Sequence, residues 1–331
     1  MKKSLSRYLP ALALTLALLM PAAAEQRAEG DDENHVVILH TNDTHSGILP
    51  MESGKNSGCG GYARREEYIK KVRSENKNVI LLDAGDFSQG SPFFSLFKGD
   101  VEIELMNALG YDAATIGNHE FDNGQDELAR RTGNAEFPLL CANYTFNKSN
   151  LNSLLKPYVI IERAGKKFGI IGLTVNVKNV VAKKFQDGME YQNHIEVANA
   201  LAERLRKEEG CNVIIALTHI GFRGDIELAE QSKEIDIIVG GHSHTTIEDK
   251  KVVKNLNGND VIVVQDGEKG EFVGRWIYGY KREEALLFVA LPIFFSLLCP
   301  NLNRIVIGNR RHIGILLLMK NNCPLLAGRD A

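Results

Sequence analysis

The chain has 331 residues, of which 44% are hydrophobic and 24% are charged, a composition typical of an ordinary globular protein. Its length is enough for one large domain or two modest ones with a substantial buried core. The formal net charge of −3 gives no electrostatic reason to expect a nucleic acid or an anionic membrane as partner.

Residues 1–24 have the pattern of a secretory signal peptide. A positively charged start precedes the apolar residues 9–20, and the alanines at 22–24 form a small-residue cleavage site. A retained membrane anchor is the alternative, but the apolar run is short for a bilayer span. We therefore expect a periplasmic or secreted protein, in which the polar residues 25–34 form a flexible leader.

Short apolar runs then alternate with longer segments of helical periodicity. Strands that are buried on both faces have such near-continuous apolar sequences. The predicted strands are residues 36–39, 79–82, 113–116, 159–161, 168–173, 213–217, 235–239 and 261–264. The predicted helices are residues 62–75, 101–109 and 195–209. This alternation indicates an α/β domain with a mostly parallel sheet.

The sequence changes character after residue 280. Residues 281–331 contain two apolar runs separated by a basic stretch, without helix caps or turn signals. Three interpretations are open: a membrane anchor, a final strand and helix, or an out-of-frame or truncated tail outside the fold. We favour the third, and we expect membrane association only if the first applies.

Five polar clusters directly follow predicted strands. Their side chains are Asp43 and His45; Asp86; Asn118, His119 and Asp122; His219; and His242 and His244. The carboxyl ends of parallel strands meet at one edge of a sheet, where ligands bind. We therefore expect these side chains to converge, with flanking glycines allowing the tight turns that carry them.

The chemistry of these side chains indicates a metal centre. Carboxylate, amide and imidazole donors suit Zn, Mn, Fe or Mg better than a thiolate-seeking metal. Seven donors are too many for one tetrahedral ion, but they fit two divalent ions that share a bridging carboxylate. A single histidine is more often structural than a ligand, so the prediction depends on all five clusters together.

The clusters also resemble a known family. The set D-x-H, G-D, G-N-H-E, T-H and G-H-x-H resembles the calcineurin-like metallophosphoesterases. Within them, T-N-D-T-H-S, G-D-F-S-Q-G, G-N-H-E-F-D-N-G and V-V-Q-D-G-E-K-G-E-F-V-G-R resemble the secreted 5'-nucleotidase family, over roughly residues 35–275. This resemblance implies a four-layer α/β/β/α sandwich.

The resemblance also implies roles for individual residues. It assigns Asp43, His45 and His244 to the first metal, Asn118, His219 and His242 to the second, and Asp86 to the bridge. His244 stands where the family often has Asn or Gln. Hydroxide activated by the metals would attack phosphorus, and His119 would stabilise the phosphoryl group or protonate the leaving oxygen. Asp122 would orient His119, or would cap the following helix, or both.

These roles predict a phosphomonoester hydrolase resembling 5'-nucleotidase and 2',3'-cyclic phosphodiesterase, with a small phosphate ester, a nucleotide, as substrate. Family members usually continue into a C-terminal domain that binds the substrate. The match ends near residue 275, so we expect residues 35–280 to form the catalytic domain and the second domain to be absent. Activity would then be weak and broad. The alternative is an inactive fragment that retains a metal site.

Overall fold

The computed structural model describes residues 35–53, 56–248, 250–279, 303–307 and 315–320. The predicted signal peptide at 1–24, the leader at 25–34 and most of the tail at 281–331 lie outside these residues. Within the described residues, no helix is both long and apolar enough to span a bilayer.

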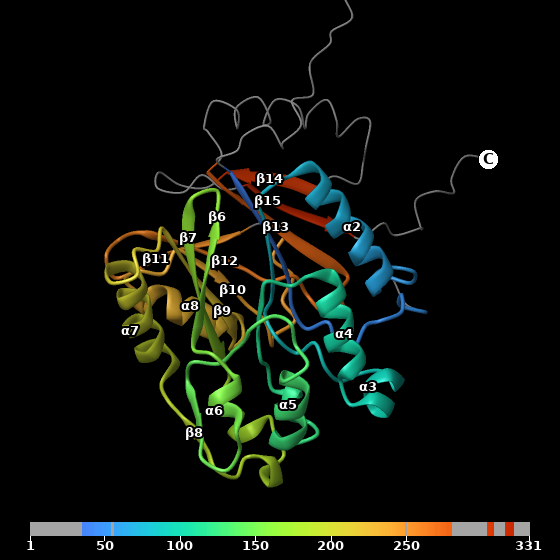
Figure 1. Cartoon of the computed structure of the whole chain (residues 1–331). Helices are drawn as coiled ribbons and strands as arrows, with labels where there is room; N and C mark the ends of the chain where they lie inside the picture. Colours follow the sequence, from blue (N-terminus) through green and yellow to red (C-terminus); the bar gives the residue numbers. More distant parts are fainter. Residues whose placement is uncertain (1–34, 54–55, 249, 280–302, 308–314, 321–331) are drawn as a thin grey trace, which may run out of the picture.

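Two mixed sheets form the centre of the protein (Figure 1). The first sheet has the order β14 (Asn303–Ile307), β15 (Ile315–Lys320), β13 (Phe272–Tyr278), β1 (Val36–Thr41), β2 (Val79–Asp83), β3 (Ala113–Thr115) and β4 (Leu139–Leu140). The second has the order β11 (Lys251–Lys254), β12 (Asp260–Val264), β10 (Ile237–Val239), β9 (Val213–His219), β7 (Lys166–Thr174) and β6 (Tyr158–Arg163). A separate pair joins β5 (Tyr144–Phe146) to β8 (Met189–Tyr191).

Each sheet has a set of parallel strands, and the strands that flank this set are antiparallel to it. β1 to β4 run parallel, whereas β13 pairs antiparallel with β1. In the second sheet β7, β9, β10 and β12 run parallel between the antiparallel β6 and β11. Two segments of the tail, β14 and β15, extend the first sheet beyond β13.

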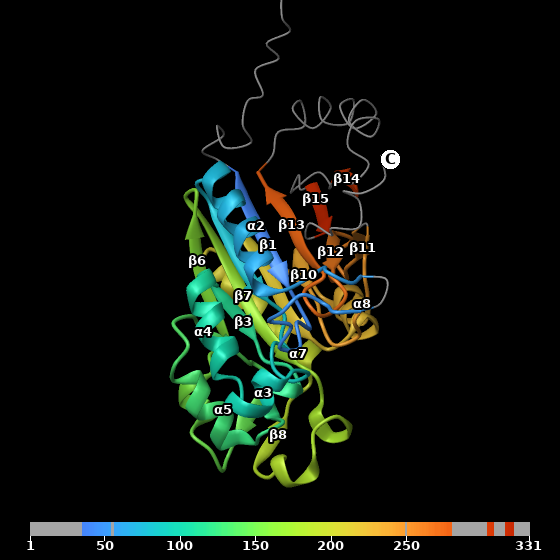
Figure 2. The same ribbon diagram turned by 90° about the vertical axis from the view of Figure 1, so that its right-hand side faces the viewer.

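Helices cover the outer faces of the two sheets (Figure 1 and Figure 2). On the first sheet these are α2 (Tyr62–Glu75), α4 (Asp100–Leu109) and α5 (Gln125–Thr132). On the second sheet they are α7 (His194–Lys207) and α8 (Phe222–Gln231). The short helix α3 (Pro92–Phe97) lies with α5 and β8 at the end toward which β1 points (Figure 2), and the short helix α6 (Leu151–Leu154) contacts α5 (Figure 1).

Side chains that alternate along the strands build three separate cores. In β1, Val37 and Leu39 pack with the helices of the first sheet, whereas Val36 and Ile38 face the second sheet. In β9, Ile215 and Leu217 face the first sheet, whereas Ile214 and Ala216 pack on the side of α7 and α8. Successive strand residues point to opposite faces, so three cores separate four layers. The predicted α/β/β/α sandwich is confirmed.

The boundaries of the predicted elements agree closely with the structure. The helix predicted at 62–75 is α2, and the one at 101–109 is α4 with one further residue at its start. All eight predicted strands are present, although β10 begins at Ile237, two residues later than expected. These strands are apolar on both faces because each lies between two of the cores.

Candidate metal centre

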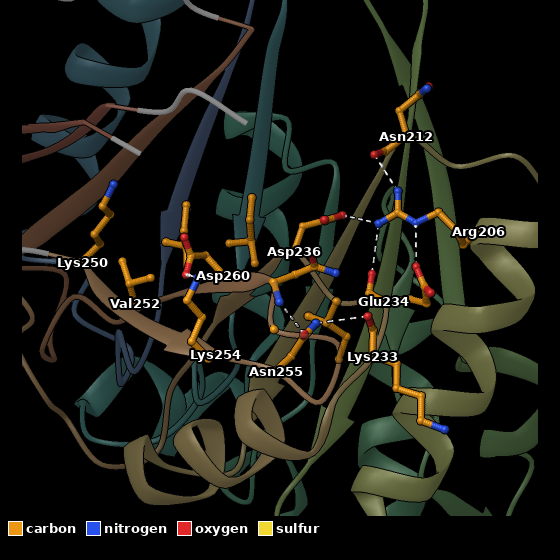
Figure 3. A pocket seen from close by; sticks show the side chains of 15 residues that line it. Arg206, Asn212, Lys233, Glu234, Asp236, Lys250, Val252, Lys254, Asn255 and Asp260 are labelled. Atoms are coloured by element: carbon orange, nitrogen blue, oxygen red, sulfur yellow. Dashed lines mark hydrogen bonds and ion pairs between the residues drawn. The ribbon is translucent and has the colours of Figure 1, made fainter. Parts of the chain in front are cut away.

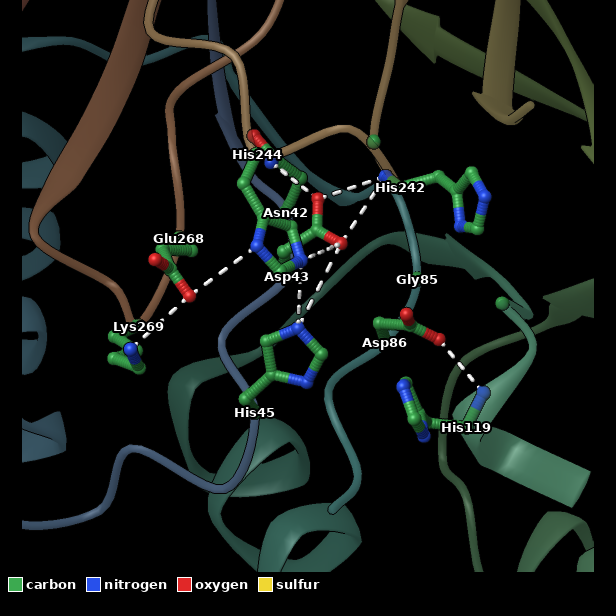
Figure 4. Close-up of polar contacts among 12 residues, drawn as sticks. Asn42, Asp43, His45, Gly85, Asp86, His119, His242, His244, Glu268 and Lys269 are labelled. Atoms are coloured by element: carbon green, nitrogen blue, oxygen red, sulfur yellow. Dashed lines mark hydrogen bonds and ion pairs between the residues drawn. The ribbon is translucent and has the colours of Figure 1, made fainter. Parts of the chain in front are cut away.

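Six of the seven residues predicted as metal ligands, all but Asn118, lie in groups of donors at the carboxyl ends of the parallel strands (Figure 4). β1 and β2 end in register, as do β7 and β9, so the turns that follow them start at the same level. Three groups of donor atoms lie within reach of a common ion: Asp43, His45 and His244; His45, Asp86 and His119; and Asp86, His219 and His242. The predicted convergence is therefore observed.

One group surrounds Asp43, whose side chain is fully buried. The Nε2 atoms of His45 and His244 lie 3.0 Å apart. The Oδ1 atom of Asp43 is 3.4 Å from Nε2 of His244 and 3.9 Å from Nε2 of His45. Three electron-rich atoms thus face one another, an arrangement that suits a cation between them.

The other group surrounds Asp86, which is also buried. Its Oδ2 atom lies 2.9 Å from Nε2 of His219, and the rings of His219 and His242 are 5.2 Å apart. Asp86 also belongs to a donor group with His45, so its carboxylate stands between the two sets of histidines. A bridging carboxylate requires this position.

Asn118 provides a direct test of whether the site fits a metal. Its side chain is 4% exposed, and its Oδ1 atom has no hydrogen-bond partner. A buried amide oxygen without a donor costs about 1–3 kcal/mol, so native proteins rarely leave one in this state. A divalent cation accepts such an oxygen as a ligand. The donor set and this orphaned oxygen both fit a metal site.

The backbone at five of the seven predicted ligands is left-handed. The φ angles are 48° at Asp43, 44° at His45, 53° at Asp86, 77° at His242 and 52° at His244. Residues other than glycine adopt this region uncommonly, because the Cβ atom crowds the backbone. Such conformations concentrate at functional sites where the surrounding structure enforces them.

Glycines allow the ligand turns to approach one another closely. A Cβ atom on Gly117 would lie 2.2 Å from Oδ1 of Asp86 and 2.7 Å from Nε2 of His219. A Cβ atom on Gly241 would lie 2.7 Å from the carbonyl oxygen of Ala84. Any side chain at these two positions would push the ligand turns apart.

The carboxylate of Glu120 connects two of these turns, a role that the sequence did not reveal. Its side chain is fully buried, and it accepts backbone hydrogen bonds from Asp86 at 2.9 Å, Ser88 at 3.0 Å and Gly117 at 2.6 Å. Arg131 donates to the carbonyl of Glu120 at 2.5 Å. The final glutamate of the G-N-H-E motif therefore positions the loops that carry ligands.

His119 and Asp122 form the predicted pair. The Nδ1 atom of His119 lies 2.8 Å from Oδ2 of Asp122, and this hydrogen bond raises the pKa of His119. Asp122 does not cap a helix through its side chain, because α5 begins after Gly124. The ring of His119 is 30% exposed at the edge of the site, where it can reach a substrate.

Asp86 and His219 shift each other's pKa. Although burial opposes ionisation, the neighbouring His219 lowers the pKa of Asp86. Burial also favours neutral His219, but the Asp86 carboxylate outweighs it and raises the pKa of His219. A bound divalent cation would keep Asp86 ionised and would hold His219 in its neutral, coordinating form.

A cleft of about 530 Å³ lies elsewhere on the protein (Figure 3). It is lined by residues at the amino ends of β9, β10 and β12, opposite to the end that carries the metal ligands. Some of its charges are paired: Arg206 lies 2.5 Å from Asp236, and Lys254 lies 2.5 Å from Asp260.

The two-sheet sandwich, with Asp and His side chains gathered at its strand ends, presents candidate ligands for metal ions at one edge. Residues 36–246 match the family described as calcineurin-like phosphoesterase, and the chain belongs to this family. The resemblance found in the sequence is confirmed.

Similar curated proteins include a 5'-nucleotidase and a nucleotide phosphoesterase. The chain is 37% identical over 290 residues to the snake venom 5'-nucleotidase of Gloydius brevicauda, covering 80% of this chain and 48% of that one. It is 35% identical to the trifunctional nucleotide phosphoesterase protein YfkN of Bacillus subtilis, covering 72% of this chain and 18% of that one. The chain thus spans about half or less of the length of these curated relatives.

A solved structure agrees with the sequence comparisons. The 5'-nucleotidase precursor from Thermus thermophilus superposes with a TM-score of 0.70 at 30% identity. The match covers 80% of this chain and 60% of that one.

Proposed function

We propose that this protein hydrolyses phosphate monoesters of small molecules, with two divalent metal ions in its active site. The proposed ligands are Asp43, His45 and His244 for one ion, Asn118, His219 and His242 for the other, and Asp86 as the bridge. The observation that carries this proposal is the position of the buried Asp86 carboxylate between two sets of histidines. Zn, Mn, Fe and Mg are the candidate metals.

When bound, such a pair of ions neutralises phosphoryl oxygens and lowers the pKa of water. The chain itself contributes the general acid. His119 lies beside Asp86, to which its backbone N–H donates at 2.8 Å, and its ring faces His45 at 5.3 Å. Asp122 holds Nδ1, so Nε2 of His119 is free to donate a proton to the leaving oxygen.

The substrate that we propose is a nucleotide, as in 5'-nucleotidase and 2',3'-cyclic phosphodiesterase. This choice is supported by the names of the relatives and by the family match. We also propose that residues 35–280 form the catalytic domain and that the protein is exported to the periplasm or the exterior.

The decisive experiment compares AMP with p-nitrophenyl phosphate as substrates of the wild type and of His119→Ala. From AMP, adenosine leaves as a basic alkoxide that needs a proton, whereas p-nitrophenolate leaves without one. We expect kcat for AMP to fall by about 10²- to 10⁴-fold and kcat for p-nitrophenyl phosphate to fall far less. Elemental analysis should find two metal ions per chain in both proteins.

Two results would contradict the proposal. Wild-type protein that binds no divalent ion after dialysis in metal-containing buffer would remove the metal centre altogether. Loss of a metal ion from His119→Ala, with equal loss of both activities, would make His119 a ligand and not the general acid. His119 belongs to a donor group with His45 and Asp86, so this second outcome is a real test.

A further inference from the structure

Glu268 approaches the candidate metal centre from outside the ligand set. It lies in the loop between β12 and β13, and its Oε2 atom is 3.3 Å from Nδ1 of His244 (Figure 4). The opposite ring nitrogen, Nε2, faces Asp43 and His45. The imidazole of His244 therefore stands between a carboxylate behind it and the cluster of donors in front.

The loop that carries Glu268 is fixed directly to Asp43. The Nδ2 atom of Asn42 donates to Oδ2 of Asp43 at 2.6 Å and to the carbonyl of Gly267 at 2.7 Å. The backbone N–H of Lys269 donates to the carbonyl of Asp43 at 2.7 Å. The residues on both sides of Glu268 are thus tied to the ligand turn, which sets the place of its carboxylate.

The two ring nitrogens of His219 face different groups. The Nδ1 atom of His219 lies 2.7 Å from the carbonyl oxygen of Ala84, which leaves Nε2 facing Asp86. A ligand histidine nearly always donates its second N–H to an acceptor in this way, which fixes its tautomer and orientation. For His244, the Glu268 carboxylate faces Nδ1 at 3.3 Å, in the place that such an acceptor would take.

His244 has particular need of such support. Its side chain is 38% exposed, whereas that of His219 is fully buried and that of His45 is 8% exposed. The surrounding protein therefore restrains the ring of His244 least. Its backbone also adopts a left-handed conformation, which sets the direction in which the side chain leaves the turn.

We propose that Glu268 is a positioning residue that keeps the proton of His244 on Nδ1 and directs Nε2 to the first metal ion. This inference rests on the metal centre of the proposed function. Glu268 also contacts Nζ of Lys269 at 3.2 Å, so its carboxylate is held from two directions.

The test is a titration of metal-free, full-length protein with Co²⁺, followed by its visible absorption and by calorimetry. The variants are Glu268→Ala, Glu268→Gln and, as a matched control, Glu104→Ala on the exposed face of α4. In Glu268→Ala we expect one of the two ions to bind about 10- to 100-fold more weakly. Glu268→Gln should recover part of this loss, because its amide oxygen still accepts the Nδ1 proton.

The outcomes separate this inference from the proposed function. Wild-type protein that takes up no Co²⁺ overturns both. Two ions bound with unchanged affinities in Glu268→Ala overturn the role of Glu268 and leave the metal centre intact. Equal weakening of both ions, with a lower unfolding temperature of the metal-free variant, would show that Glu268 only supports the loop and would also overturn the inference.

Discussion

Replacing Glu120 with glutamine tests how much the ligand turns depend on one buried carboxylate. One oxygen of Glu120 accepts from Ser88, and the other accepts from both Asp86 and Gly117. Glutamine offers only one oxygen, so at least one backbone N–H must face an amide NH₂ group. An unsatisfied buried donor costs about 1–3 kcal/mol, and the bonds that remain lose their charge assistance. We expect a total loss of about 3 kcal/mol.

This loss corresponds to a fall of roughly 6–12 °C in the unfolding temperature of a domain of this size. The assay is thermal unfolding in chelator, followed by circular dichroism. Burial raises the pKa of Glu120, so a buffer of about pH 8 favours the carboxylate. Glu104→Gln, on an exposed face, is the control. A change below about 1 kcal/mol in Glu120→Gln would refute the reasoning, because one unsatisfied donor alone should exceed it.

Two further predictions concern groups next to the site. Burial raises the pKa of Asp225 to about 8, despite its hydrogen bond from Thr218, so the folded protein holds a proton that the unfolded chain releases near pH 4. The free energy of unfolding should therefore fall as pH rises from about 4 to about 8, by up to about 1.4 kcal/mol per pH unit. Asp225→Asn should flatten this pH dependence when stability is measured by urea unfolding. Gly117→Ala should cost about 1–3 kcal/mol and weaken metal binding, because its Cβ would overlap Asp86; unchanged metal titrations would contradict this steric argument.

Much of the fold could be predicted because local patterns agree with the tertiary structure. The 62–75 helix follows from its helical periodicity, and the strands follow from their short, nearly continuous apolar runs. The antiparallel placement of β6 beside β7, and of β13 beside β1, was not predicted. Strand direction depends on contacts between distant segments, and nothing within a short apolar run encodes it.

The predicted ligands were found in the sequence because each directly follows a strand that ends at the same edge. Glu120 and Glu268 were not identified as functional, although both stand inside the quoted motifs. Their roles depend on partners far along the chain: Glu120 accepts from Asp86, and Glu268 contacts His244. A carboxylate beside a ligand in sequence gives no sign of which distant backbone or ring it will hold.

The left-handed turns have a consequence for how the site acquires its ions. Hydrogen bonds within the protein hold these turns: Glu120 accepts from the backbone of Asp86, and Asn42 donates to Asp43 and to Gly267. The chain therefore bears the conformational cost during folding, and loading requires little rearrangement. We expect ions to enter and leave a binding site that is already formed. Local abundance and intrinsic affinity would then decide which metal binds. The same polypeptide would then carry different metals in different surroundings.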